Sequence, residues 1–175
     1  MRQIKINSTT GSEILTTQNV KDYVRIDTTA DDNLITAMIS QARIWCENYI
    51  TRDIVAKNRT YYLDSTNGIF DLPFGPISSI SEITIDGTAT TSYEILGLDN
   101  ETIELDQGPA ERVKITYVTQ GLNDALVKQA MLQLISTYYD NRADFIEGNS
   151  RGIGNSVEIP TSTKQILTSY KTMFI

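Results

Sequence analysis

Residues 31–52 read DDNLITAMISQARIWCENYITR, and this stretch is typical of a long amphipathic helix. Two aspartates open it, where the helix dipole favours negative charge. Apolar side chains recur at helical spacing along one stripe, made of Leu34, Ile35, Met38, Ile39, Ala42, Trp45, Cys46, Tyr49 and Ile50. Because no polar group converges on this stripe, we interpret it as core or subunit interface rather than a cofactor site, with Cys46 as a small buried apolar residue.

Residues 55–118 change to a β pattern, in which short β-branched and aromatic runs are separated by Gly, Pro, Asn and Asp. The predicted strands span residues 59–63, 69–72, 80–85, 93–96, 102–105 and 113–118. Asp86-Gly87 is a strong turn signal and Asp99-Asn100 a weaker one, so antiparallel hairpins are predicted. No helical pattern separates the strands, and a parallel βαβ arrangement is therefore not expected.

Two further helices are predicted on either side of this β region. A short one covers residues 15–27, with Thr16 or Thr17 as its cap. A long one covers residues 123–145, with Asn123 as its cap and Asp124 in its first turn. Apolar residues cover a wide arc of the long helix, so it has to be buried on two sides, by helix 31–52 and by the sheet or a neighbouring subunit.

The C-terminal region is predicted to be a flexible linker over residues 148–160, rich in Gly, Asn and Ser, followed by a helix over 161–175 that Thr161 caps. One face of this helix carries Ile166, Leu167, Tyr170, Met173 and Phe174. Such a helix beyond a linker indicates an arm that docks on a partner; the alternative is that it folds back on its own domain. The predicted class is therefore α+β, with a core over residues 1–147, a linker and a docking helix.

Composition excludes most enzyme mechanisms. The chain has 175 residues, 40% of them hydrophobic and 21% charged, which suits one folded domain. It has no histidine and one cysteine, so Ser-His-Asp and Cys-His mechanisms, imidazole zinc sites and internal disulfides are impossible. A net charge of -7 argues against a surface that wraps nucleic-acid phosphates. No apolar run resembles a membrane span or a secretory signal, so we expect synthesis in a cytoplasm and no membrane association.

Three short stretches are weak candidates for a ligand site. Residues 140–144 begin like a calcium loop, but Arg142 stands where an oxygen ligand is required. Residues 148–154 lack the Gly-Lys-Ser/Thr ending of a phosphate loop. Acidic residues of the 99–106 stretch alternate with apolar ones, which fits the solvent face of a strand better than a cation site. We therefore predict no catalytic, cofactor-binding or metal-binding residue.

A series of motifs runs through the chain in a characteristic order: VKDYVRID at 20–27, DDNLI at 31–35, ENYI at 47–50, PISSI at 76–80, YVTQG at 117–121, VKQA at 127–130 and YYDNR at 138–142. In this order they resemble the head-tail connector proteins of long-tailed bacteriophages, which are also called adaptor or head-completion proteins. The chain departs from that family pattern in lacking a proline before the second long helix and in its glycine-bearing segment before the C-terminal helix.

The resemblance implies a structural subunit rather than an enzyme. It implies a ring of about twelve copies, located in the virion neck after assembly in the host cytoplasm. The implied partners are the portal protein, a tail or stopper protein and, through passive contact in the channel, DNA. The apolar face of helix 161–175 is then the candidate surface for the portal or a neighbouring subunit, and the candidates for subunit packing are Trp45, Tyr49, Tyr138, Tyr139 and Arg142.

Two alternatives stay open at this point. One is a tail-completion or terminator ring of the same virion, which follows the same ring geometry lower in the assembly. The other is a small hydrolase that uses acidic residues of the β region, although no pair of carboxylates is singled out. For the adaptor, an acidic surface facing the channel would repel DNA and let it slide.

Overall fold

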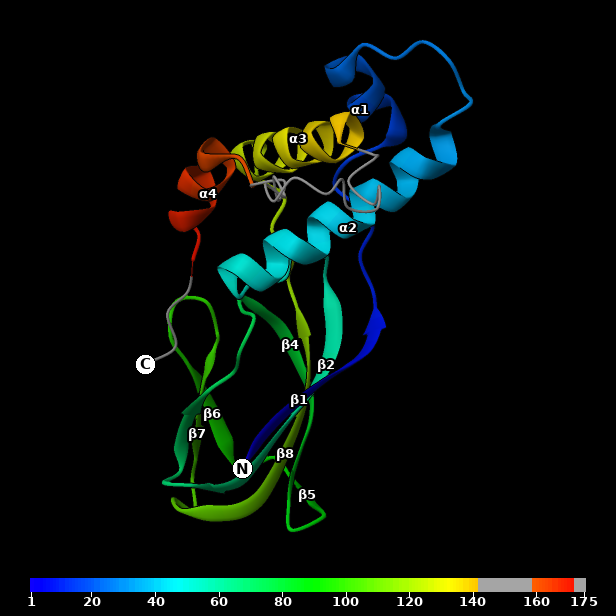
Figure 1. Cartoon of the computed structure of the whole chain (residues 1–175). Helices are drawn as coiled ribbons and strands as arrows, with labels where there is room; N and C mark the ends of the chain where they lie inside the picture. Colours follow the sequence, from blue (N-terminus) through cyan, green and yellow to red (C-terminus); the bar gives the residue numbers. More distant parts are fainter. Residues whose placement is uncertain (142–158, 172–175) are drawn as a thin grey trace, which may run out of the picture. The chain divides into compact units, whose positions relative to one another are not determined.

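The described chain passes three times between two folding units in a computed structural model that describes residues 1–141 and 159–171 (Figure 1). The β unit consists of residues 1–12 and 51–122, and the helical unit of the described residues among 13–50 and 123–171. The described residues form four helices and eight strands, and the sheets are antiparallel, so the predicted α+β class is confirmed.

The two longest helices form the centre of the helical unit, and each packs against all the others. The unit contains α1 (Thr17–Val24), α2 (Asp32–Ile50), α3 (Ala125–Asp140) and α4 (Thr161–Thr168). Helix α3 packs against each of the other three, and every residue of it from Val127 to Tyr139 is buried or half-buried. The wide apolar arc of α3 thus has cover within its own unit, because helices lie on several of its sides.

Of the three N-terminal cap residues predicted from the sequence, the structure confirms the one at α1. Thr16 caps α1 as predicted: the Asn19 N–H donates to Thr16 Oγ1 at 3.2 Å, and the Thr16 N–H donates to Asn19 Oδ1 at 3.0 Å. For α3, the predicted cap Asn123 is wrong, because the Asp124 carboxylate accepts from the Leu126 N–H at 2.8 Å. The predicted cap of α4 is also wrong, since Thr161 is already helical and no side chain caps this helix.

The predicted ends of these helices run past the described residues. Helix α3 ends at Asp140, and the remainder of the predicted 123–145 helix lies mostly outside the described part of the chain. Helix α4 ends at Thr168, seven residues before the predicted end, and the last four of those lie outside the described residues. Nearly all of the predicted 148–160 linker lies outside them as well.

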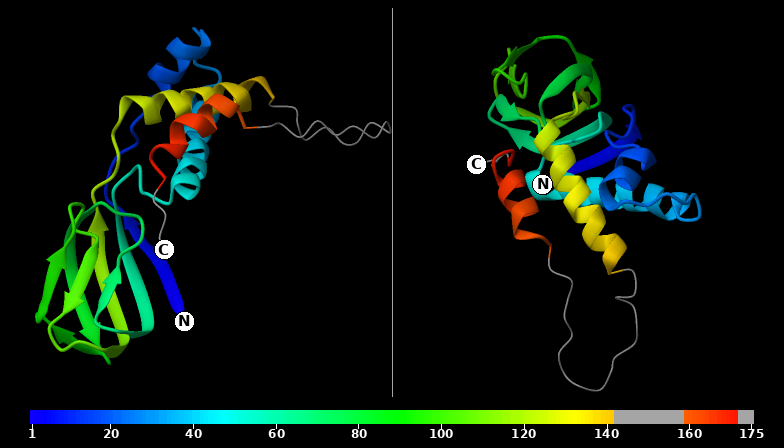
Figure 2. Two further views of the ribbon diagram at one scale, coloured as in Figure 1. Left: turned by 90° about the vertical axis from the view of Figure 1, so that its left-hand side faces the viewer. Right: turned by 90° about the horizontal axis from the view of Figure 1, so that it is seen from above.

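The β unit is a sandwich of two antiparallel sheets (Figure 2). The larger sheet has the order β1 (Arg2–Thr9), β2 (Lys57–Thr66), β8 (Ala110–Thr119), β4 (Ile77–Ile85) and β5 (Thr88–Thr90). The smaller sheet has the order β3 (Ile69–Asp71), β7 (Thr102–Leu105) and β6 (Tyr93–Leu96). Strands β6 and β7 have the predicted bounds.

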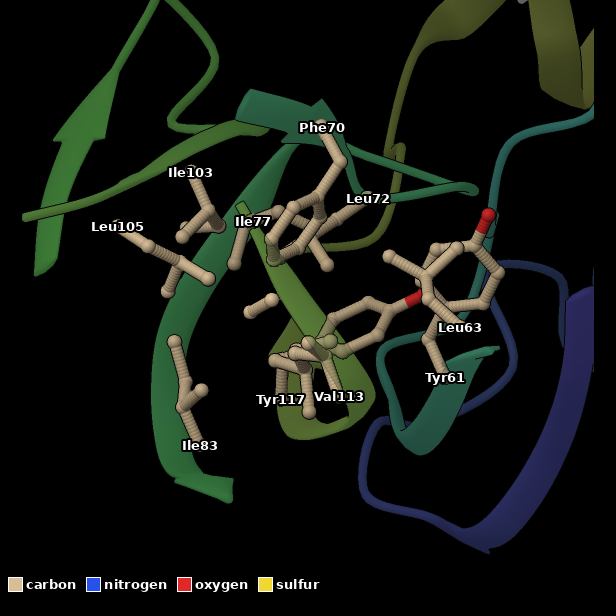
Figure 3. Packing of buried hydrophobic residues seen from close by; sticks show 12 residues of the cluster. Tyr61, Leu63, Phe70, Leu72, Ile77, Ile83, Ile103, Leu105, Val113 and Tyr117 are labelled. Carbon is tan, nitrogen blue, oxygen red and sulfur yellow. The ribbon is translucent and has the colours of Figure 1, made fainter. Parts of the chain in front are cut away.

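The core of the β unit lies between the two sheets (Figure 3). In β7, Ile103 and Leu105 are buried while Thr102 and Glu104 are half-buried, so the predicted alternation of the 99–106 stretch is confirmed. Both sheets contribute side chains to this core: Tyr61, Leu63, Phe70, Leu72, Ile77, Ile83, Ile103, Leu105, Ala110, Val113, Ile115 and Tyr117. Alternation of period two thus places one face of each sheet inside and leaves the other for solvent.

The turn signals were correct, whereas two strands were not predicted. Asp86 and Gly87 have φ angles of 50° and 80°, which form the tight turn between β4 and β5. Strand β5 itself is a three-residue Thr-Ala-Thr run without large apolar residues. Strand β1 lies at the edge of the larger sheet, pairs with β2 and is exposed at every residue.

Candidate partner-binding surfaces

The described residues bear on metal binding, membrane spanning and thiol chemistry. Among them, no group of three or more Cys, Asp and Glu residues is placed to hold a metal ion. None of the helices in the described ranges is long and apolar enough to cross a membrane. Cys46 is fully buried, and burial raises the pKa of its thiol to about 12, so the nucleophilic thiolate is not populated at neutral pH. The candidate sites predicted from the sequence are surfaces on the helices of the helical unit.

Two of the predicted packing residues form an aromatic pair on α2. The rings of Trp45 and Tyr49 stack with centroids 5.2 Å apart and an angle of 14° between their planes, and both are half-buried. The Tyr49 hydroxyl lies 3.2 Å from Thr168 Oγ1 of α4, and the Lys171 ammonium lies 5.4 Å from the Tyr49 ring centroid. The end of α4 therefore lies beside this aromatic pair.

The other predicted packing residues lie at the end of α3. Tyr138 and Tyr139 are half-buried, and burial raises the pKa of Tyr138. The Tyr139 hydroxyl donates to Asp31 Oδ2 at 2.6 Å, so it ties α3 to the residue before α2. Arg142, the fifth packing candidate, lies outside the described residues.

The predicted partner-binding face of α4 is divided by its packing. Leu167 is fully buried, whereas Ile166 and Tyr170 are half-buried. The Tyr170 hydroxyl donates to Asp124 Oδ1 at 2.6 Å, and this hydrogen bond is the main cause that lowers the pKa of Asp124. Met173 and Phe174 lie outside the described residues. Of the predicted face, Ile166 and Tyr170 are thus the described residues that offer accessible surface.

The predicted apolar stripe of α2 contains charged groups that the sequence reasoning missed. Arg43 is buried and donates from Nε to both carboxylate oxygens of Glu13 at 2.9 Å, and from Nη1 to Glu47 Oε2 at 2.9 Å. The interpretation that nothing polar converges on the stripe is therefore wrong. Leu34, which was assigned to the same stripe, is 38% exposed and is therefore not part of the core of its own chain. The i, i+4 spacing of Arg43 and Glu47 was the available signal.

The β unit contains a second buried ionic cluster. The Asp53 carboxylate accepts from Lys57 Nζ at 2.9 Å, from Arg59 at 2.6 and 2.7 Å, and from Thr119 Oγ1 at 2.8 Å. The Arg59 guanidinium also lies 3.8 Å from the centroid of the Phe74 ring. These groups bond to one another inside the unit, so removal of any one of them would leave a buried charge without its partner.

The outer faces of the two sheets carry charges that have no ion-pair partner among the described residues. On the smaller sheet, Glu94 of β6 lies directly opposite Glu104 of β7. On the larger sheet, Lys5 of β1 and Lys114 of β8 line one hollow of about 560 Å³. The hollow is also lined by Gln3, Ile4, Thr60 and Tyr62.

A family model described as "Head completion protein" matches residues 13–173. One similar structure is a chain from the neck of an empty gene transfer agent (GTA) particle computed with C6 symmetry. It matches with a TM-score of 0.76 and 14% identity, over 99% of this chain and 97% of that one. A chain from the neck of a native GTA particle computed with C12 symmetry is similar with a TM-score of 0.70 and 12% identity, at the same coverage. At such identities these structures show a shared fold. No curated protein matches the chain.

Proposed function

The chain belongs to the head completion protein family, and from this premise we propose that it is a structural adaptor in the neck of a phage-like virion. In this role it joins the portal protein of the capsid to a tail or stopper protein after DNA packaging, and surrounds the DNA passage. It acts by binding other chains and not by catalysis, and it uses no cofactor.

The observation that carries this proposal is the extent of the family match. It covers residues 13–173, which include the whole described helical unit and the strands from β2 to β8. The similar chains come from necks computed with C6 and C12 symmetry, which supports a closed ring of about twelve copies for this chain as well. The net charge of -7 suits a ring that DNA passes without binding tightly.

The partner surface on the helical unit is formed by half-buried aromatic and apolar side chains. We assign the contact with the portal or a neighbouring subunit to Trp45, Tyr49, Ile166 and Tyr170, with Met173 and Phe174 extending the same segment. Aromatic side chains in such positions are frequent anchors of protein interfaces, because they bury large area at low entropic cost. Leu167 supports this surface from inside the unit, since its side chain has no exposed area.

The test measures the mass of the full chain by light scattering after size exclusion, alone and mixed with its portal protein. We expect either a ring that forms unaided or a monomer that becomes a ring on the portal. A monomer indifferent to the portal that instead forms a ring on the tail would support the tail-completion alternative. A monomer indifferent to both would contradict the adaptor role.

Two neighbouring substitutions on α4 separate partner binding from folding. Leu167→Ala is expected to lower the free energy of unfolding by about 2–5 kcal/mol, because it opens a cavity at a fully buried position. Ile166→Ala is expected to cost less stability and to weaken portal binding at least about tenfold, or about 1.4 kcal/mol. Unchanged portal binding in a folded Ile166→Ala chain would remove α4 from the partner surface.

A further inference from the structure

The basic face is the part of the larger sheet's outer surface that surrounds the hollow, where Lys5 and Lys114 are the charged residues, while Glu82 lies further along the Lys5 row. The strand register aligns Gln3, Tyr62 and Lys114 across β1, β2 and β8, with Lys5 and Thr60 in the adjacent row. Their neighbours in the register, such as Tyr61 and Ile115, are buried in the core, so these residues lie on the opposite, outer face. Lys5 and Lys114 are exposed and border the same hollow, and neither forms an ion pair within the described residues.

The outer face of the other sheet is acidic. The register aligns Ile69, Glu104 and Glu94 across β3, β7 and β6, while Phe70 and Ile103 point to the core. Two carboxylates directly opposite each other on neighbouring strands repel, which costs stability in the isolated chain. No cation among the described residues offsets this repulsion. Ile69 is 56% exposed in the same row, so the acidic face also carries an unpartnered apolar side chain.

The charges of the whole β unit are segregated along the sequence. Residues 60–111 contain ten acidic residues and no Lys or Arg, whereas the rest of the chain has 15 basic and 12 acidic residues. The acidic face comes entirely from this block, and both lysines of the basic face come from outside it. The same folding unit therefore presents a hollow with two lysines on one sheet and a pair of glutamates on the other.

We propose that these two faces bind each other between neighbouring copies of the chain, with Lys5 and Lys114 of one copy opposite Glu94 and Glu104 of the next. The proposal rests on the ring of the proposed function, because a ring closed by rotation joins each copy to the next through two different faces. In the ring, the neighbour's lysines offset the repulsion between the two glutamates. Ile69 supplies the apolar part of the contact. It would pack against Tyr62 of the other copy, which lies on β2 between the two strands that carry the lysines.

The structure favours a second copy over DNA as the occupant of the basic face. Tight binding of duplex DNA needs many phosphate contacts from clustered Lys and Arg, whereas only two lysines line the hollow. The acidic face of the next copy offers two carboxylates on adjacent strands. The lysines lie on strands β1 and β8, with β2 between them, and reach toward the carboxylates through long, flexible side chains. Complementary potentials of this kind fix orientation and register in protein interfaces.

The proposal is tested with two charge-reversed full-length chains. The first carries Lys5→Glu and Lys114→Glu, so both of its faces are acidic. The second carries Glu94→Lys and Glu104→Lys, so both of its faces are basic. Asp22→Lys with Asp27→Lys, both exposed in the helical unit, is the matched control for the second chain. Ring formation is followed by light scattering after size exclusion, with the portal protein present.

Each reversed chain alone is expected to need at least about tenfold more protein to form a ring, because like charges meet at every contact. An equimolar mixture of the two is expected to form rings as the wild type does, since copies can alternate with an acidic face always against a basic one. The control chain is expected to form rings on the portal as the wild type does, without a second chain in the mixture. Recovery on mixing also shows that both reversed chains are folded.

Three results would overturn the pairing of the two faces. The first is normal ring formation by each reversed chain without the other. The second is a mixture of the two that forms no rings. The third is a chain with Lys5→Glu and Lys114→Glu that assembles normally but loses affinity for a short DNA duplex. The last result would assign the lysines to nucleic acid. A wild-type chain that forms no ring, with or without the portal, contradicts the proposed function itself, so the two failures are distinguishable.

Discussion

Asp53 holds two buried cations in the β unit, and its chemistry determines how that unit responds to substitution. Burial alone would raise the pKa of the carboxyl group, but the hydrogen bonds and charges of Arg59 and Lys57 outweigh burial and lower it. The carboxylate is therefore ionised at neutral pH. Removing its charge would leave two buried cations without an anion beside them. Loss of one partner from a buried ion pair lowers the free energy of unfolding strongly.

We predict that Asp53→Asn lowers the free energy of unfolding by about 3–5 kcal/mol. The control is Asp86→Asn, which removes one charge from the ion pair with Arg112, where both side chains are more than half exposed. It is expected to cost much less than Asp53→Asn, because exposed ion pairs contribute little. Urea unfolding followed by circular dichroism measures both. Equal losses in the two variants would contradict the structural role of Asp53.

The same carboxylate predicts a dependence of stability on pH. Its pKa is lower in the folded state than the value of about 3.9 in an unfolded chain. Its contribution is therefore complete above that unfolded value and is lost as the pH falls through the folded pKa. We expect the stability difference between wild type and Asp53→Asn to be largest near neutral pH and to shrink below about pH 4. A difference that stays constant on acidification would contradict this linkage.

At the scale of the element, the loops that join the two sheets depend on close backbone contact. Gly68, between β2 and β3, has a φ angle of 104°, and a Cβ atom placed on it would lie 2.7 Å from the backbone of Gly108. Gly87, in the β4–β5 turn, has a φ angle of 80° with open space around the same position. The two glycines therefore separate backbone strain alone from strain combined with a steric clash.

We predict that Gly87→Ala costs about 1–2 kcal/mol, the usual cost of left-handed backbone for an L-residue. Gly68→Ala is expected to cost at least about 1 kcal/mol more, because the backbone of the second loop has to move. Thermal or urea unfolding of the two variants measures the difference. A Gly68→Ala chain as stable as Gly87→Ala would show that the two loops do not need this contact.

The β6–β7 hairpin carries a prediction that follows from its like charges. Glu104→Lys replaces the repulsion with Glu94 by an attraction across the strands. We expect it to stabilise the isolated chain by about 0.2–1 kcal/mol, whereas Glu111→Lys, with Ser65 opposite, should change little. If Glu104→Lys destabilises the isolated chain, the two carboxylates do not repel in the fold.

The elements that the sequence predicted well are those with local signals. Strands β6 and β7 have alternating residues and turn residues beside them, so their bounds follow from the pattern. Strand β1 alternates Ile4 and Ile6 with polar residues, but its partner β2 begins about fifty residues later and no hairpin turn marks the pairing. The contact between Glu13 and Arg43 was missed for the same reason, since these two residues meet only through packing of distant segments.

At the scale of the whole molecule, the candidate surfaces divide between the two units. The helical unit offers half-buried aromatic residues, which the periodicity of α2 and α4 already indicated. The β unit offers two charged faces that no local pattern reveals, because Lys5 and Lys114 come together only through the order β1-β2-β8. Sequence reasoning therefore predicted the apolar surface, which stays a prediction, and did not predict that Lys5 and Lys114 lie together.

The electrostatic surface predicts how assembly responds to salt. Exposed charges interact over a screening length of about 10 Å at 0.1 M salt and about 3 Å at 1 M, so ring formation by the wild type should weaken as salt rises. A chain in which Lys5, Lys114, Glu94 and Glu104 are all replaced by Gln removes these charges without creating repulsion. It is expected to assemble less readily at low salt and to respond much less to salt, because the apolar contact of Ile69 is not screened. Light scattering over a salt series compares the two chains. Parallel salt responses would mean that other charges hold the ring together.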